Sequence, residues 1–123
     1  YAHHPKELRV LIDSVRKLYP EKDIFLIFQP HLFSRTQDLE KDFCAILSTV
    51  NQLVLFDIYA AREKPIDGIT SKQLLKKINL EHKWYSDCQG LQEILTTASP
   101  DLIITAGAGD IYKIIPTIKS ILL

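Results

Sequence analysis

The sequence predicts an α/β fold, an open and mainly parallel sheet of Rossmann-like type with helices on both faces. Two observations predict it. Helical and strand-like patterns alternate along the chain, and the strand-like segments are short continuous apolar runs such as residues 24–28 and 53–58. Such runs are typical of parallel strands buried on both faces. With 123 residues, 46% of them hydrophobic, we expect one domain over residues 1–123.

The first half of the chain shows the alternation most clearly. Apolar residues recur at helical spacing over residues 8–18, with Pro5 near the first turn and Pro20 just beyond the end. The apolar run that follows is expected to be the first strand. A second helical pattern covers residues 39–50, and the next apolar run predicts the second strand.

The second half continues the same alternation. In order, we expect a short helix around residues 74–78, a strand over 82–85, a helix over 86–98, a strand over 101–105 and a helix over 110–122. Ser86 is expected to cap the fourth helix, and Pro116 to bend the last one. The pattern therefore predicts four or five strands and five helices.

Charge and cysteine content exclude several classes. Fifteen Lys and Arg balance fifteen Asp and Glu, so the chain lacks the charge of a duplex nucleic-acid or anionic-membrane binder. We see no secretory signal and no apolar run of the roughly 18 residues that a membrane span needs. Cys44 and Cys88 show no metal or redox spacing, which favours free thiols in the cytoplasm. Because the chain lacks Met and begins at Tyr1, we expect a piece of a longer protein.

Three loops follow predicted strands, over residues 30–36, 59–65 and 106–110. Ligands of open parallel sheets bind beyond the carboxyl ends of the strands. Two of the four arginines, Arg35 and Arg62, fall in these loops. Because arginine suits bidentate capture of carboxylate or phosphate, the pattern favours an anionic ligand.

Less specific interpretations stay open for each of these residues. Arg35 and Arg62 have nearby acids, Asp38 and Glu63, as alternative partners. His31 has the chemistry to contact a ligand or to act as an acid or base, but a loop histidine bonded to a backbone carbonyl is equally ordinary.

The glycine-rich turn and the two early histidines carry weaker signals. Residues 107–110, Gly-Ala-Gly-Asp, allow backbone amides to approach an anion at a helix start, yet Asp110 as a helix cap explains them too. The turn matches neither a dinucleotide nor a Walker motif. His3 and His4 lack an acid at ligand spacing, so we expect no metal site. No catalytic triad is visible, and no catalytic residue is assigned to this domain.

Four segments of the chain carry a combined signal. They are Tyr-Ala-His-His-Pro at 1–5, Phe-Gln-Pro-His at 28–31 with Ser-Arg-Thr at 34–36, Asp-Ile-Tyr at 57–59 with Ala-Arg-Glu-Lys-Pro-Ile at 61–66, and Ala-Gly-Ala-Gly-Asp-Ile at 106–111. Taken together they resemble the C-terminal domain of the Mur ligase family, and within it the ligases that join L-alanine to UDP-N-acetylmuramate. The segments occur in the right order at plausible spacing.

The resemblance implies a bacterial, cytoplasmic enzyme of three domains. An N-terminal domain would bind the UDP-sugar, and a central ATPase would hold ATP and magnesium. The C-terminal domain would close the active site and help bind the amino acid. ATP would phosphorylate the lactyl carboxylate of UDP-N-acetylmuramate, and the amine of L-alanine would attack the acyl phosphate. The isolated domain is expected to be inactive.

Carried over by position, Tyr1 would lie near the nucleotide. His3, His31, Arg35 and Arg62 would contact substrate. Many members have arginine where this chain has Leu32, so one expected positive charge is missing. Two alternatives remain: a stand-alone α/β module that binds a small anion without catalysis, and a protein-interaction domain that only keeps the fold.

Overall fold

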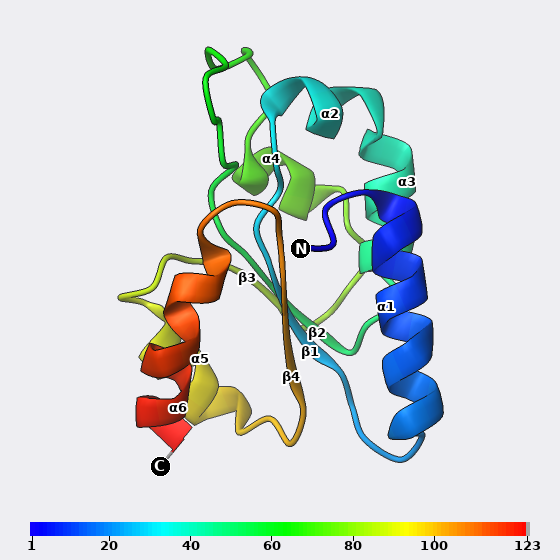
Figure 1. The fold of residues 1–123 in the computed structure, drawn as a ribbon, viewed down its shortest axis with the longest axis vertical. Helices are drawn as coiled ribbons and strands as arrows, with labels where there is room; N and C mark the ends of the chain where they lie inside the picture. The colour runs from blue at the N-terminus through cyan, green and yellow to red at the C-terminus, as the bar shows by residue number, and fades with distance from the viewer. Residues whose placement is uncertain (123) are drawn as a thin grey trace.

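The computed structural model describes residues 1–122 and confirms the α/β class (Figure 1). The strands form one parallel sheet in the order β3-β2-β1-β4. Their bounds are β1 (Phe25–Phe28), β2 (Gln52–Leu55), β3 (Lys83–Tyr85) and β4 (Ile103–Ala106). Each overlaps the segment that was predicted to be a strand, over residues 24–28, 53–58, 82–85 and 101–105.

Helices cover both faces of this sheet (Figure 1). In the described part of the chain they are α1 (Pro5–Leu18), α2 (Phe33–Asp38), α3 (Glu40–Leu47), α4 (Ser71–Lys76), α5 (Leu91–Ala98), the 3₁₀ helix η1 (Ile111–Ile114) and α6 (Ile115–Leu122). α1, α3 and α4 pack on one face, and α5, η1 and α6 pack on the other.

Strand β1 lies at the centre of the core. All four of its side chains are fully buried. Leu26 and Phe28 belong to the cluster that includes Leu8 and Phe43, whereas Phe25 and Ile27 face the cluster on the other side. Burying side chains of this size stabilises a fold by about 1.5–3 kcal/mol each. The continuous apolar run is thus explained by burial on two faces.

The strand order creates a switch point between β1 and β4. From β1 the chain proceeds outward to β2 and β3 through helices on one face, and it then returns past β1 to β4 by way of α5 on the other face. At such a point the loops after two neighbouring strands diverge and leave a crevice at the carboxyl ends. The loops after β1 and β4 therefore border the predicted site.

The prediction of an unbroken loop over residues 30–36 was wrong, because α2 begins at Phe33. This helix has only six residues, and Leu32 at its N-cap makes no side-chain capping bond. Neither an apolar stripe nor a local cap marks it in the sequence. Its first turn is held instead by a residue far along the chain, as described below.

One helix start was placed wrongly. Ser86 does not cap the fourth helix: its hydroxyl donates to the Asp87 carbonyl, and α5 begins only at Leu91. The last helical segment agrees with its predicted range, but it opens as the 3₁₀ turn η1 after Asp110, and α6 follows from Ile115 with Pro116 in its first turn. A missing N–H costs little in the first turn of a helix, so proline is accommodated there.

Candidate functional site

The loops after β1 and β2 are bonded to each other along their backbones. His31 and Tyr59 form an isolated parallel bridge. The Tyr59 amide donates to the Pro30 carbonyl at 2.8 Å, and the Leu32 amide donates to the Tyr59 carbonyl at 2.9 Å. These bonds extend the pairing of the sheet beyond its strands. They confirm that these two predicted loops open on the same edge.

Aromatic rings bring the N-terminal segment to this edge. The His3 and His31 rings are 5.5 Å apart between centroids in an edge-on contact, and the His31 and Tyr59 rings are 5.7 Å apart and stacked. His3 Nδ1 also lies 2.9 Å from the carbonyl oxygen of Tyr1. The rings of His3, His31 and Tyr59 therefore form one row. Tyr1 joins it only through its backbone carbonyl, and its side chain is 83% exposed.

The start of α1 fixes His3 in that row. Pro5 occupies the first turn, and His4 Nδ1 accepts from the Lys6 amide at 3.1 Å. The Glu7 carboxylate accepts from the His3 and His4 amides at 3.3 and 3.0 Å. These two amide bonds hold the pKa of Glu7 below its usual value. His4 thus has a local role as a helix cap.

His31 lies in a positive and partly buried environment. Burial lowers the pKa of its imidazole, and the nearby charges of His3 and Arg35 lower it further, while Glu63 acts in the opposite direction. A lowered pKa keeps the ring neutral at physiological pH. In the neutral state the ring offers one donor and one acceptor to a ligand.

The two loop arginines do not form the ion pairs with Asp38 and Glu63 that the sequence left open. Within residues 1–122 the one Lys or Arg ion pair is Lys77 with Glu40, and His3 Nδ1 lies 3.4 Å from Glu7 Oε1. Arg35 lies in α2 and is partly buried, whereas Arg62 is exposed in the loop after β2. Both guanidinium groups keep their charge unneutralised by a carboxylate contact among the described residues.

Buried polar atoms without a partner gather in one segment of the chain. In the part of the chain that the structure describes they are Gln29 Oε1, His31 Nδ1 and Arg35 Nη1. Such atoms are costly and rare in folded proteins. All three lie between residues 29 and 35, at the carboxyl end of β1. Their placement is the arrangement expected of a site that awaits a polar ligand.

The glycine-rich loop after β4 packs against the same segment. A Cβ on Gly107, whose φ is +151°, would lie 3.0 Å from the Gln29 carbonyl oxygen. A Cβ on Gly109 would lie 2.5 Å from Cγ of Tyr59. Asp110 stands at the N-cap of η1 but makes no capping bond, and its carboxylate accepts from Gln29 Nε2 at 3.1 Å. Close packing thus accounts for both glycines.

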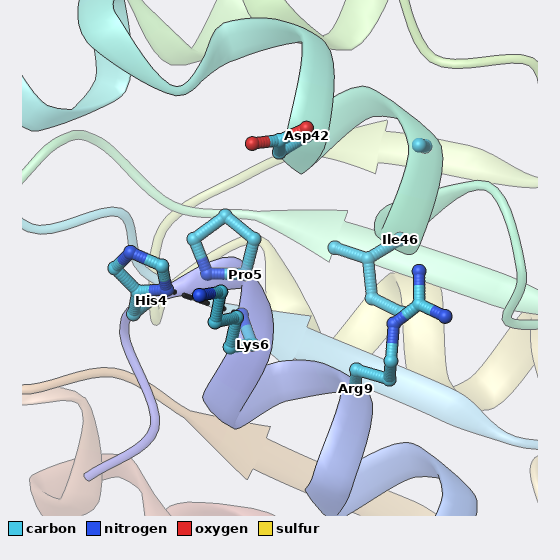
Figure 2. Close-up of a pocket in the computed structure, with 7 residues that line it drawn as sticks. His4, Pro5, Lys6, Arg9, Asp42 and Ile46 are labelled. Carbon is cyan, nitrogen blue, oxygen red and sulfur yellow. Dashed lines mark hydrogen bonds between the residues drawn. The ribbon is translucent and has the colours of Figure 1, made fainter.

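A groove lies away from this edge, between the start of α1 and α3 (Figure 2). It is a groove of about 420 Å³ lined by His4, Pro5, Lys6, Arg9, Asp42, Ala45 and Ile46. Figure 2 shows the side chains of His4 at the N-cap of α1 and of Pro5, Lys6 and Arg9 on α1, beneath Asp42 of α3. None of the three buried unpartnered atoms belongs to this groove.

A family model described as "Mur ligase, glutamate ligase domain" matches residues 1–109. The chain belongs to the Mur ligase family. Among its curated relatives, the UDP-N-acetylmuramate–L-alanine ligases of Christiangramia forsetii and Flavobacterium johnsoniae are 43% and 46% identical over 123 residues. The ligase of the same name from Cytophaga hutchinsonii is 46% identical over 119 residues. These matches confirm the family resemblance seen in the four segments.

This Mur ligase chain spans about a quarter of the length of those relatives. The matches cover 100%, 99% and 97% of this chain but only 27%, 27% and 26% of the three relatives. A crystal structure from Haemophilus ducreyi shares the fold, with a TM-score of 0.73 at 15% identity. It covers 100% of this chain and 87% of that one. That structure is of a domain assigned to a UDP-N-acetylmuramate:L-alanyl-γ-D-glutamyl-meso-diaminopimelate ligase.

The Mur ligase fold thus gathers Tyr1, His3, His31 and Arg35 near the end of β1, with Arg62 exposed on the neighbouring loop. Two contributors were not singled out from the sequence: Gln29, which is 8% exposed, and Ser34. Both lie inside the segments that carry the family resemblance. Their long-range partners, Asp110 and Glu63, are visible only in the folded chain.

The described residues show neither a metal cluster nor a membrane helix. Across residues 1–122, no group of three His, Cys, Asp or Glu side chains is placed to hold a metal ion. None of the helices in this range has the length and apolar character needed to cross a bilayer.

Proposed function

We propose that this chain is the C-terminal domain of an ATP-dependent bacterial ligase that joins L-alanine to UDP-N-acetylmuramate. The relatives with that name, 43–46% identical, support the assignment. The domain closes the active site and presents its carboxyl-edge residues to the amino acid and the acyl phosphate. N-terminal UDP-binding and central ATPase domains of the same protein complete the enzyme.

One observation carries this proposal. The buried polar atoms that lack a partner among residues 1–122 all lie within residues 29–35, beside two arginines that no carboxylate contacts. A folded protein tolerates such a cluster where a ligand supplies the missing partners. An unpaired guanidinium suits a carboxylate or phosphate.

The proposed reaction has two steps. ATP transfers its γ-phosphoryl group to the lactyl carboxylate, which gives ADP and an acyl phosphate. The uncharged amine of L-alanine then attacks the acyl carbon. The tetrahedral intermediate loses a proton and expels phosphate, leaving an amide. Negative charge gathers on the phosphate and on the intermediate, so fixed positive groups stabilise both steps.

The residues of this chain take separate roles in that scheme. Arg35 holds the carboxylate of L-alanine or the acyl phosphate, and Arg62 adds positive charge from the exposed loop. His31, kept neutral by its surroundings, offers a hydrogen bond. His3 supports the His31 ring, and Tyr1 lies beside the nucleotide. Closure of the domain excludes water that would hydrolyse the acyl phosphate.

ATP and magnesium would be held mainly by the central domain. Among residues 1–122 no group of three His, Cys, Asp or Glu side chains is placed to hold a metal ion, so we assign the magnesium to the central domain. We place the reaction in the bacterial cytoplasm, where ATP is available. The free thiols of Cys44 and Cys88 are consistent with a reducing compartment. We propose neither a nucleic-acid nor a membrane partner.

Replacing Arg35 in the intact ligase tests the proposal. We expect Arg35→Ala to lower kcat/KM for L-alanine by about 10²-fold, the scale of losing one aimed charge contact. Arg9→Ala, an exposed arginine on α1, serves as the matched control and should leave kcat/KM unchanged. An effect of Arg35→Ala below about threefold would remove Arg35 from the site.

The isolated 123-residue chain tests the alternative of a stand-alone anion-binding module. We expect it to unfold cooperatively and to show no ATP hydrolysis. Turnover by this chain alone would overturn the proposal. Two results together would favour the stand-alone module instead. The isolated chain would bind small carboxylates at micromolar concentration, and the Arg35→Ala ligase would keep full activity.

A further inference from the structure

Glu63 bonds to a helix that is distant from it in sequence. Its Oε1 accepts from the Ser34 amide at 3.2 Å, and its Oε2 accepts a short hydrogen bond from the Ser34 hydroxyl. Ser34 lies in the first turn of α2, 29 residues before Glu63. One carboxylate thus ties the loop after β2 to the helix that carries Arg35.

Helix α2 has no cap of its own. Leu32 stands at the N-cap with a φ of +69°, and its side chain makes no capping bond. Positive φ is uncommon in a leucine and strains the backbone. A helix of six residues is also too short to be stable alone. The first amides of a helix lack partners within the helix, and a carboxylate there accepts from them and complements the positive end of the helix. Glu63 does this at the Ser34 amide.

The loop that presents Glu63 is itself held in place. Its start is joined to the loop after β1 by the Tyr59 and Leu32 amides. Further on, the Glu63 amide donates to the Ala60 carbonyl at 2.9 Å across a turn in which Ala61 has a φ of +54°. Glu63 therefore contacts α2 from a loop that is hydrogen-bonded to the edge of the sheet. Its bonds to Ser34 fix the first turn of α2 relative to that edge.

The same bonds remove Glu63 from its arginine neighbours. Both carboxylate oxygens are committed to Ser34, and among residues 1–122 no ion pair joins Glu63 to Arg35 or Arg62. An acid within the loop thereby serves the helix without forming an ion pair with either arginine.

We propose that Glu63 is a positioning residue, which aims the Arg35 guanidinium at the anionic group of the substrate by clamping the first turn of α2 through Ser34. This inference rests on the proposed ligase function. It adds a residue that contacts no substrate yet sets the geometry of one that does. A displacement of about 1 Å in a substrate-positioning group is enough to cost 10²-fold in rate.

A double-mutant cycle in the intact ligase tests this inference. We expect Glu63→Ala to lower kcat/KM for L-alanine about tenfold or more. The KM for ATP should stay within twofold of wild type. In an Arg35→Ala background, Glu63→Ala should cost less than twofold further, because the group that it aims is gone. Lys64→Ala, the exposed neighbour in the same loop, is the matched control and should change neither constant.

Two milder variants keep the test decisive if Glu63→Ala folds poorly. Ser34→Ala removes the hydroxyl bond but keeps the amide bond, and Glu63→Gln keeps an acceptor at the same position. Each should lose less kcat/KM than Glu63→Ala, and each loss should again vanish in the Arg35→Ala background.

The outcomes separate this inference from the proposed function. If Arg35→Ala alone leaves kcat/KM within threefold of wild type, the proposed site fails, and with it the role of Glu63. A second outcome is that Arg35→Ala lowers kcat/KM severely, while Glu63→Ala and its milder forms have no effect or lower kcat/KM as much in the Arg35→Ala background as in wild type. That outcome overturns the positioning role and leaves the site in place.

Discussion

The imidazole of His31 lies stacked on the phenol ring of Tyr59, with 5.7 Å between the ring centroids and 13° between the ring planes. The two residues follow different strands, and their backbones are paired as well. Tyr59 is in turn backed by Gly109, from the loop after β4. Three strand ends therefore determine where the His31 ring lies, which makes the ring sensitive to small changes behind Tyr59.

Gly109→Ala tests this dependence. The new Cβ would lie 2.5 and 2.7 Å from two atoms of the Tyr59 ring and 2.9 Å from Gln29 Oε1, so the ring must move and take His31 with it. We expect kcat/KM of the intact ligase to fall tenfold or more. Overpacking should also destabilise the domain by about 1–3 kcal/mol.

Gly68→Ala is the control for this substitution. A Cβ at Gly68 meets nothing within 4 Å, but its φ of +81° strains any other residue. We therefore expect a loss of stability of about 1–2 kcal/mol with kcat/KM unchanged. Equal losses of kcat/KM in the two glycine variants would contradict a specific role for the contact between Gly109 and Tyr59.

The titration of His31 gives a second test. Burial and the charges of His3 and Arg35 lower the pKa of its imidazole. Arg35→Ala removes one of these charges, so we expect the His31 pKa to rise in that variant. Arg62→Ala removes a charge that is not among those acting on His31, so it should leave the His31 pKa unchanged. The measurement is an NMR titration of the histidine rings in the isolated chain, and a fall in the pKa of the Arg35→Ala variant would refute the assignment.

The same lowered pKa has a consequence for stability. Because the folded value lies below the unfolded one, the unfolded chain binds more protons in the window between them. The contribution of His31 to the free energy of unfolding is therefore complete above the ordinary histidine pKa and declines as the pH falls toward the folded value. A stabilisation of the fold on acidification through this window, attributable to His31, would contradict the sign.

Tyr85 provides a test at alkaline pH. Its hydroxyl donates to the Asp57 carboxylate, and this bond, together with burial, raises the pKa of Tyr85 to about 12. Asp57→Ala should return the pKa toward 10, as an ultraviolet titration of tyrosinate would show. Asp67→Ala, an exposed acid in the same connection, should leave the titration unchanged. Since the folded pKa is raised, the stabilising contribution is complete below pH 10 and is lost as the pH approaches 12.

The sequence predicts the edge of the sheet better than the contacts at that edge. Parallel strands all end on the same side, so the apolar runs around β1 and β2 were enough to bring His31 and Tyr59 together. The partners of Gln29 and Ser34 could not be foreseen, because Asp110 and Glu63 lie 81 and 29 residues away. These side chains gain their roles only when the loops meet.

Local sequence signals for the start of a helix also failed, most clearly where the capping group comes from a distant residue. Helix α2 was missed because its cap comes from Glu63 rather than from a Ser, Thr, Asp or Asn just before it. Ser86 looked like a cap and is not one, since its hydroxyl donates to the carbonyl of the next residue, Asp87. By contrast, α4 has an ordinary cap in Thr70, whose hydroxyl accepts from the Gln73 amide at 3.1 Å. This helix, Ser71–Lys76, overlaps the one predicted around residues 74–78.

The buried hydroxyl of Ser71 anchors the loop that carries Tyr59 and Glu63, which gives a last prediction. Ser71 is 1% exposed, and its hydroxyl donates to the carbonyl of Phe56 at the start of that loop. Ser71→Ala would leave this buried carbonyl without that donor. We expect the free energy of unfolding to fall by about 1–3 kcal/mol.

Chemical denaturation of the isolated chain measures this loss, with Ser14→Ala as the matched control. The Ser14 hydroxyl also donates to a carbonyl, that of Val10, but on the exposed side of α1. Water can replace this bond, so the control should change stability by no more than about 0.5 kcal/mol. Because the amides of Tyr59 and Leu32 still join the loop to its neighbour, kcat/KM of the intact Ser71→Ala ligase should stay within threefold of wild type. A tenfold loss of kcat/KM at unchanged stability would mean that Ser71 serves the site directly and does not merely anchor the loop.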